Sequence, residues 1–113
     1  MTNDAQDTEK SLNWYQKCAQ ATAQYPAETA LAYVLLGLGG EVGEIQNKYK
    51  KVLRGDKALN REDLTAELGD VLWYVAMLAT ELGVSLQEVA EQNVTKLQQR
   101  AHKGTIQGDG DYR

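Results

Sequence analysis

Four acidic residues stand in two pairs of identical spacing. Glu41 and Glu44 lie three apart within GLGGEVGEIQNKYKK, and Glu67 and Asp70 lie three apart within ELGDVLWY. Carboxylates gathered at a half-buried edge repel one another and lose hydration, so a cation or protons must compensate their charge. Oxygen ligands suit a hard divalent ion, and the four acids therefore predict a Mg²⁺ site, with Mn²⁺ as a substitute.

The two pairs hold the same position beside the apolar residues of their segments. With Glu41 at zero on a wheel of about 100° per residue, Glu44 falls near 300° and the apolar residues cluster between roughly 20° and 100°. Glu67 and Asp70 repeat this arrangement. If the apolar stripes pack as adjacent bundle helices, both pairs lie along one edge of the seam. Either pair alone would indicate only solvent-facing acids, but the shared phase favours metal binding.

Polar groups of the opposite sign follow later in the chain. Asn93, Lys96 and Arg100 fall on one side of a third helical stripe. A phosphate chain between a metal ion and these cations would satisfy both sets of charges. The alternative is a basic last turn that complements the helix dipole.

The elements that must position these groups are helices. Pro26 interrupts a first segment, Asn60 is a good N-cap, and Ser85 with Glu88 forms a capping box. We therefore expect an all-α chain with four helices, at about residues 10–24, 27–54, 60–83 and 85–102. The domain plan is a flexible N-terminus at 1–9, a helical domain at 10–104 and a glycine-rich tail at 105–113.

Size and charge restrict the function class. The 113 residues fit one domain, and a net charge of −4 argues against a general nucleic-acid binder. No apolar run is long enough to span a membrane, so no membrane partner is expected. The single cysteine, Cys18, and an acidic N-terminus without a secretion signal predict a cytoplasmic protein.

The quoted acid motifs, together with NVTKLQQR and GDGDYR, resemble the MazG-like branch of the all-α nucleoside triphosphate pyrophosphohydrolases over about residues 28–113. The family pattern is E-x-x-E, a spacer, then E-x-x-D. The resemblance implies a four-helix bundle that is completed by oligomerisation, as a homotetramer or a dimer. It also implies a Mg²⁺-dependent hydrolase that cleaves a (d)NTP to (d)NMP and pyrophosphate, in nucleotide-pool house-cleaning.

The same resemblance implies roles for further residues. Lys48 would hold phosphate oxygens at the catalytic site, and Tyr74 matches an aromatic that packs on a deoxyribose. In the metal-assisted mechanism that we expect, Glu41 is the candidate general base. Positions expected to contact substrate are Gln16, Tyr25, Asn93, Lys96, Arg100, Asp109 and Arg113. For Tyr25, packing in the core is the alternative.

Several readings stay open at this point. Tyr33, Leu36 and Trp73 lie away from their apolar stripes, which favours either a subunit interface or isolated exposed residues. A dUTPase shares the acid pattern and is the rival enzyme. A non-catalytic helical interaction protein is the rival from another class.

Overall fold

The computed structural model describes residues 10–103, and these residues form helices and connecting turns without any strand. In chain order the elements are α2 (Leu12–Gln20), the short 3-10 turn η1 (Ala27–Thr29), α3 (Ala30–Leu53), α4 (Arg61–Glu81) and α5 (Leu86–Lys103). The predicted all-α fold with four helices is confirmed. Both predicted tails, at 1–9 and 105–113, lie outside the described residues, and Asp109 and Arg113 lie there with them.

Helix ends follow the local chemistry of the sequence. The Asn60 side chain accepts a hydrogen bond from the backbone N–H of Asp63 at 3.0 Å, which starts α4. Before α5, the N–H of Glu88 donates to Ser85 Oγ at 3.0 Å and the N–H of Ser85 donates to Glu88 Oε1 at 3.3 Å. Both predicted caps are therefore confirmed. Gly83, with φ of +74°, supplies the left-handed residue that ends α4.

The first helix is shorter than predicted, and the chain beyond it makes local and tertiary hydrogen bonds. It ends at Gln20 rather than near Gln24. Beyond it, the Thr22 hydroxyl donates to the Ala19 carbonyl at 2.7 Å and accepts from Trp73 Nε1 at 2.8 Å. The indole of Trp73 is therefore half-buried and bonded inside its own chain, which weakens its assignment to a subunit interface.

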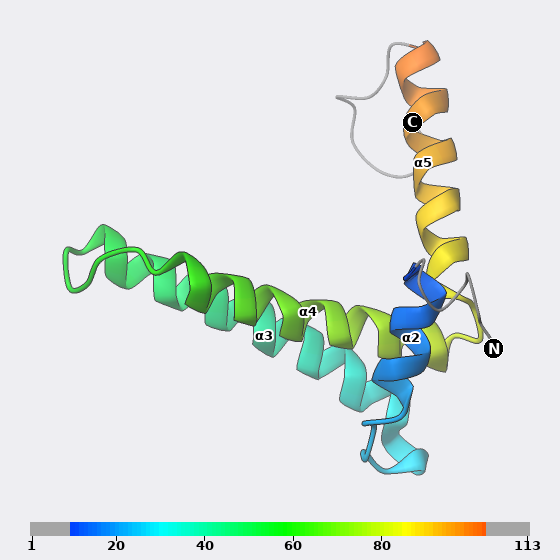
Figure 1. The fold of residues 1–113 in the computed structure, drawn as a ribbon, viewed down its shortest axis with the longest axis horizontal. Helices are drawn as coiled ribbons and strands as arrows, with labels where there is room; N and C mark the ends of the chain where they lie inside the picture. Colours follow the sequence, from blue (N-terminus) through cyan, green and yellow to red (C-terminus); the bar gives the residue numbers. More distant parts are fainter. Residues whose placement is uncertain (1–9, 104–113) are drawn as a thin grey trace.

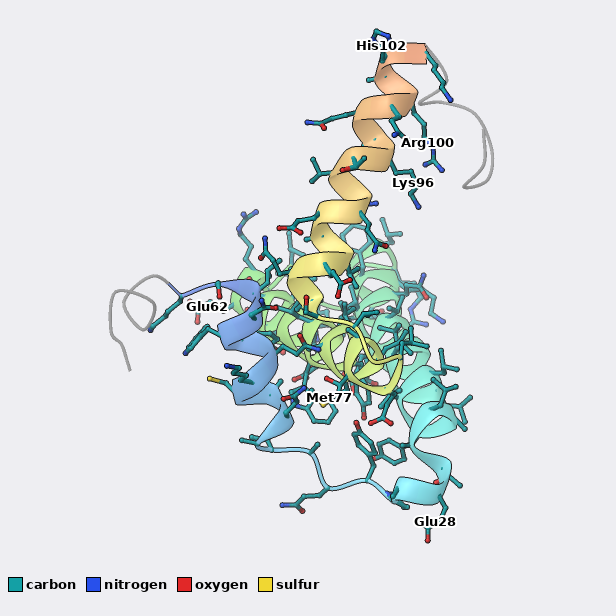
Figure 2. All side chains as sticks on the ribbon, turned by 90° about the vertical axis from the view of Figure 1, so that its right-hand side faces the viewer. Glu28, Glu62, Met77, Lys96, Arg100 and His102 are labelled. Carbon is teal, nitrogen blue, oxygen red and sulfur yellow. The ribbon has the colours of Figure 1, made fainter. Side chains whose placement is uncertain are left out.

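α3 and α4 run side by side as a long antiparallel hairpin, and α2 crosses one end of it (Figure 1). The core lies at that end, and Met77 marks it in Figure 2. The buried members of the core are Ala19, Val34, Ala76, Met77 and Leu86. Several apolar side chains of the hairpin stay open to solvent, with Leu36 77%, Leu53 72% and Leu68 61% exposed.

α5 leaves this body instead of lying along it, since its axis is bent by 98° from that of α4 (Figure 1). Two side chains of α2, Gln16 and Asn13, bond to this joint, and Gln16 makes most of the hydrogen bonds. Gln16 donates to Thr80 Oγ1 and to the Val84 carbonyl, each at 3.1 Å, and accepts from the N–H of Leu86 at 2.7 Å. α5 is thereby tied to the base of the hairpin at its first residue.

Within residues 10–103, no single helix has both the length and the apolar character needed to cross a membrane.

Candidate active site

Three carboxylates meet between α3 and α4. One oxygen each of Glu41, Glu67 and Asp70 lies within 4.8 Å of the others. We call these three residues the acid cluster. The packing of α3 along α4 brings them together, as the shared phase of the two motifs predicts. Glu44, the fourth predicted ligand, is exposed and lies outside this group.

The electrostatics of the acid cluster favour an added positive charge. Partial burial raises the pKa of Glu41, and the charges of Asp70, Glu67 and Glu44 raise it further. Partial burial and the adjacent Glu67 likewise raise the pKa of Asp70. Both shifts arise from desolvation first and from the neighbouring carboxylates second, and for Asp70 the charge of Lys48 acts in the opposite direction. Oxygen-only ligands at this spacing therefore fit a hard divalent cation.

Lys48 lies beside the acid cluster and bridges two acids of α4. Its Nζ donates to both carboxylate oxygens of Asp63, at 2.9 and 2.8 Å, and lies 3.3 Å from Glu67 Oε2. The hydrogen bond to Asp63 is the main cause that raises the pKa of Lys48. Asp63 was not among the predicted site residues. The available signal was its spacing of four from Glu67, which puts both on one helix face.

Two tyrosines flank the acids. The ring of Tyr74 lies directly over Gly37 of α3, where any Cβ would collide with it. Burial raises the pKa of Tyr74, with contributions from Tyr33, Glu41 and Asp70. Burial, then the charge of Asp70, also raises the pKa of Tyr15 on α2. Tyr15 was missed because the first helix offers no motif.

The sequence comparison decides the family. The MazG nucleotide pyrophosphohydrolase domain matches residues 28–105, more than half of the chain. The chain belongs to the MazG family. It is also 50% identical over 109 residues to the Gene 37 protein of Mycobacterium phage L5, covering 88% of this chain and 96% of that relative. No solved structure matches it.

Membership of the MazG family accounts for the chemistry of the acid cluster, because this family depends on a divalent metal. All three residues of the cluster lie inside the matched region. The MazG match starts after α2, so it covers neither Gln16 nor Tyr15.

Two residues that are predicted to contact substrate, Gln16 and Tyr25, have hydrogen-bond partners within the chain. Gln16 is buried and uses its amide to join α2, α4 and the start of α5. The Tyr25 hydroxyl donates to Glu81 Oε2 at 2.7 Å, and burial is the first cause that raises its pKa to about 12. The Tyr25 ring stacks on Tyr33 with 5.2 Å between centroids, which agrees with the core-packing alternative.

The predicted basic group is not brought to the acid cluster within one chain. Asn93, Lys96 and Arg100 lie on α5, which points away from the hairpin (Figure 1). Lys96 and Arg100 point to the same side of α5, above the hairpin in Figure 2. Among the described residues, Lys48 is therefore the predicted cation that reaches the acids.

Proposed function

We propose that this MazG chain is a Mg²⁺-dependent hydrolase of phosphoric anhydrides. It cleaves a nucleoside triphosphate to the monophosphate and pyrophosphate, and it favours deoxynucleotides. The observation that carries the proposal is the acid cluster, in which one carboxylate oxygen from each of three residues lies within 4.8 Å of the others, inside the region that matches the MazG domain.

The reaction is a hydrolysis at the α phosphorus. A water oxygen forms the new P–O bond, and the bond from the α phosphorus to the bridging oxygen breaks. The bridging oxygen leaves with pyrophosphate, and the water proton passes to a base. A bound Mg²⁺ would supply Lewis acidity that stabilises charge on the phosphate oxygens.

The residues of the chain divide this work. Glu41 is the proposed base, since a raised pKa brings a carboxylate closer to the range where it accepts a proton efficiently. Glu67 and Asp70 would hold the cation together with Glu41. Lys48, beside Glu67, offers its ammonium group to phosphate oxygens.

Tyr74 is the proposed selector of the sugar. Its ring is next to Glu41 and Asp70, where the sugar of a metal-bound triphosphate would lie. An aromatic face against C2′ leaves a 2′-hydroxyl desolvated without a partner, at a cost of about 1–3 kcal/mol. This cost would favour deoxyribose over ribose.

A second copy of the chain would complete the site. The exposed leucines of the hairpin support a homo-oligomer, as a dimer or a tetramer. In that assembly, α5 of one copy can bring Asn93, Lys96 and Arg100 to the acid cluster of another. The expected setting is the cytoplasm, with free nucleotides as substrates in nucleotide-pool house-cleaning.

The deciding experiment is turnover of canonical, uracil-containing and oxidised nucleotides in water enriched in ¹⁸O, with Mg²⁺ or Mn²⁺. We expect pyrophosphate as a product and the label in the nucleoside monophosphate. Label in released inorganic phosphate would contradict attack at the α phosphorus. Turnover restricted to dUTP would identify the rival dUTPase, and a lack of turnover with every nucleotide would favour the non-catalytic protein.

A further inference from the structure

Asp63 is a charged residue at the edge of the acid cluster whose place is fixed by the start of α4. Its backbone N–H donates to Asn60 Oδ1 at 3.0 Å, so it stands in the first turn of the helix, where a negative charge is favoured. Both of its carboxylate oxygens accept from Lys48 Nζ, at 2.9 and 2.8 Å. Asp63 is therefore a fixed anchor for a long, flexible side chain.

Lys48 has a second partner, and that partner belongs to the acid cluster. Its Nζ lies 3.3 Å from Glu67 Oε2, which is longer than either contact to Asp63. A divalent cation in the cluster needs the same Glu67 carboxylate. The ammonium group and the cation repel each other, so a bound cation favours a Lys48 that has moved away from Glu67.

We propose that Asp63 is a positioning residue that holds Lys48 beside the acid cluster while leaving Glu67 available to the metal ion. The proposal rests on the proposed function and adds a residue to its machinery. With Asp63 in place, Lys48 can break its ion pair with Glu67 and still remain within reach of a phosphate. Without Asp63, Glu67 becomes the main partner of Lys48, and the ammonium group competes with the cation.

This division of labour has a signature in metal binding alone. Removing the carboxylate of Asp63 should weaken cation binding, because Lys48 then stays on Glu67. Removing the charge of Lys48 should strengthen cation binding, because the ammonium group no longer competes for Glu67. In the absence of Lys48, Asp63 has nothing to hold, and its removal should change little.

The test is calorimetric titration with Mn²⁺, without nucleotide, of the wild type, Asp63→Asn, Lys48→Met and the double variant. Glu62→Gln is the matched control, since Glu62 is an exposed neighbour that loses the same charge. We expect Asp63→Asn to lower the affinity for Mn²⁺ by about threefold to tenfold, and Glu62→Gln to lower it by less than about twofold. Lys48→Met and the double variant should bind Mn²⁺ equally, and at least as tightly as the wild type.

Equal effects of Asp63→Asn and Glu62→Gln on Mn²⁺ affinity would overturn the proposal. It would also be overturned if adding Asp63→Asn to Lys48→Met lowered Mn²⁺ affinity as much as Asp63→Asn does in the wild type. Circular dichroism melting shows whether each variant folds. Should Asp63→Asn melt too early to titrate, weaker Mn²⁺ binding by Lys48→Met would still overturn it. A wild type that binds no Mn²⁺ would overturn the metal site of the proposed function and this inference with it. Mn²⁺ binding without the Asp63 effect would overturn this inference alone.

Discussion

The acid cluster and the basic side of α5 are both sets of charged residues at regular helical spacing, yet only the acid cluster is assembled in one chain. Glu41, Glu67 and Asp70 come from two helices that pack along each other. Lys96 and Arg100 come from a helix bent by 98° from its predecessor. Spacing on a helix thus predicts a shared face, whereas the direction of the next helix decides what that face meets.

The largest expected effect is the loss of activity when one carboxylate of the acid cluster is neutralised. Glu41→Gln should lower kcat/KM by about 100-fold or more, since it removes both a ligand and the proposed base. The metal-free melting temperature should not fall, because the variant relieves repulsion within the cluster.

Glu44→Gln is the matched comparison, because Glu44 neighbours the cluster without belonging to it. Its loss of activity should be at least about tenfold smaller than that of Glu41→Gln. Equal losses would return Glu44 to the ligand set that the sequence predicts.

The next effect concerns the basic residues of α5 and the KM for the nucleotide. Lys96→Ala combined with Arg100→Ala should raise KM by about tenfold or more, with Mn²⁺ affinity unchanged. Mixing and co-refolding this variant with Glu41→Gln should restore about a quarter of wild-type activity at low substrate, because half of randomly paired dimers then hold one intact site. If the activity of the mixture only equals the average of the two separate variants, α5 does not contribute residues to the active site of a neighbouring copy.

A smaller effect concerns the contact between the Tyr74 ring and Gly37 of α3. Gly37→Ala would push the Tyr74 ring away from α3, at a cost of about 1–3 kcal/mol in the free energy of unfolding. It should also narrow the ratio of kcat/KM for dCTP over CTP, as Tyr74→Ala should. Gly39→Ala is the control, since a Cβ there meets nothing within 4 Å. An unchanged ratio in both Tyr74→Ala and Gly37→Ala would assign sugar selection to another residue.

The smallest effect is a pH dependence of the metal-free protein. Glu41 and Asp70 have pKa values raised in the folded state, so the folded chain binds their protons more tightly than the unfolded chain. The free energy of unfolding should therefore rise as pH falls from neutrality through these raised pKa values, and level off below the ordinary carboxyl range. Asp63, whose pKa is lowered by Lys48, opposes this only at more acidic pH.

Urea unfolding at several pH values, without metal, measures this slope. The rise should be reduced in Glu41→Gln. An identical slope in that variant and the wild type would remove the acid cluster as its cause.

The sequence was sufficient for what neighbouring residues decide. The helix starts at Asn60 and Ser85 follow from single hydrogen bonds to nearby backbone. The meeting of Glu41 with Glu67 and Asp70 follows from two equal patterns on a hairpin. Contacts between distant segments were not predictable in this way. Gln16 has no sequence pattern that marks it as the joint of α5, and its burial could be seen only in the fold.

The three hydrogen bonds of Gln16 have a consequence for the order of folding. They join residues 64 to 70 positions apart in the sequence, whereas α3 and α4 are consecutive and connected by a short turn. Closing the shorter loop costs less chain entropy and is faster. We therefore expect amide protons of α3 and α4 to gain protection first in pulsed hydrogen exchange, and the N–H of Leu86 to gain it only when α2 docks. Gln16→Leu should delay or abolish that last step while leaving the early protection of the hairpin intact.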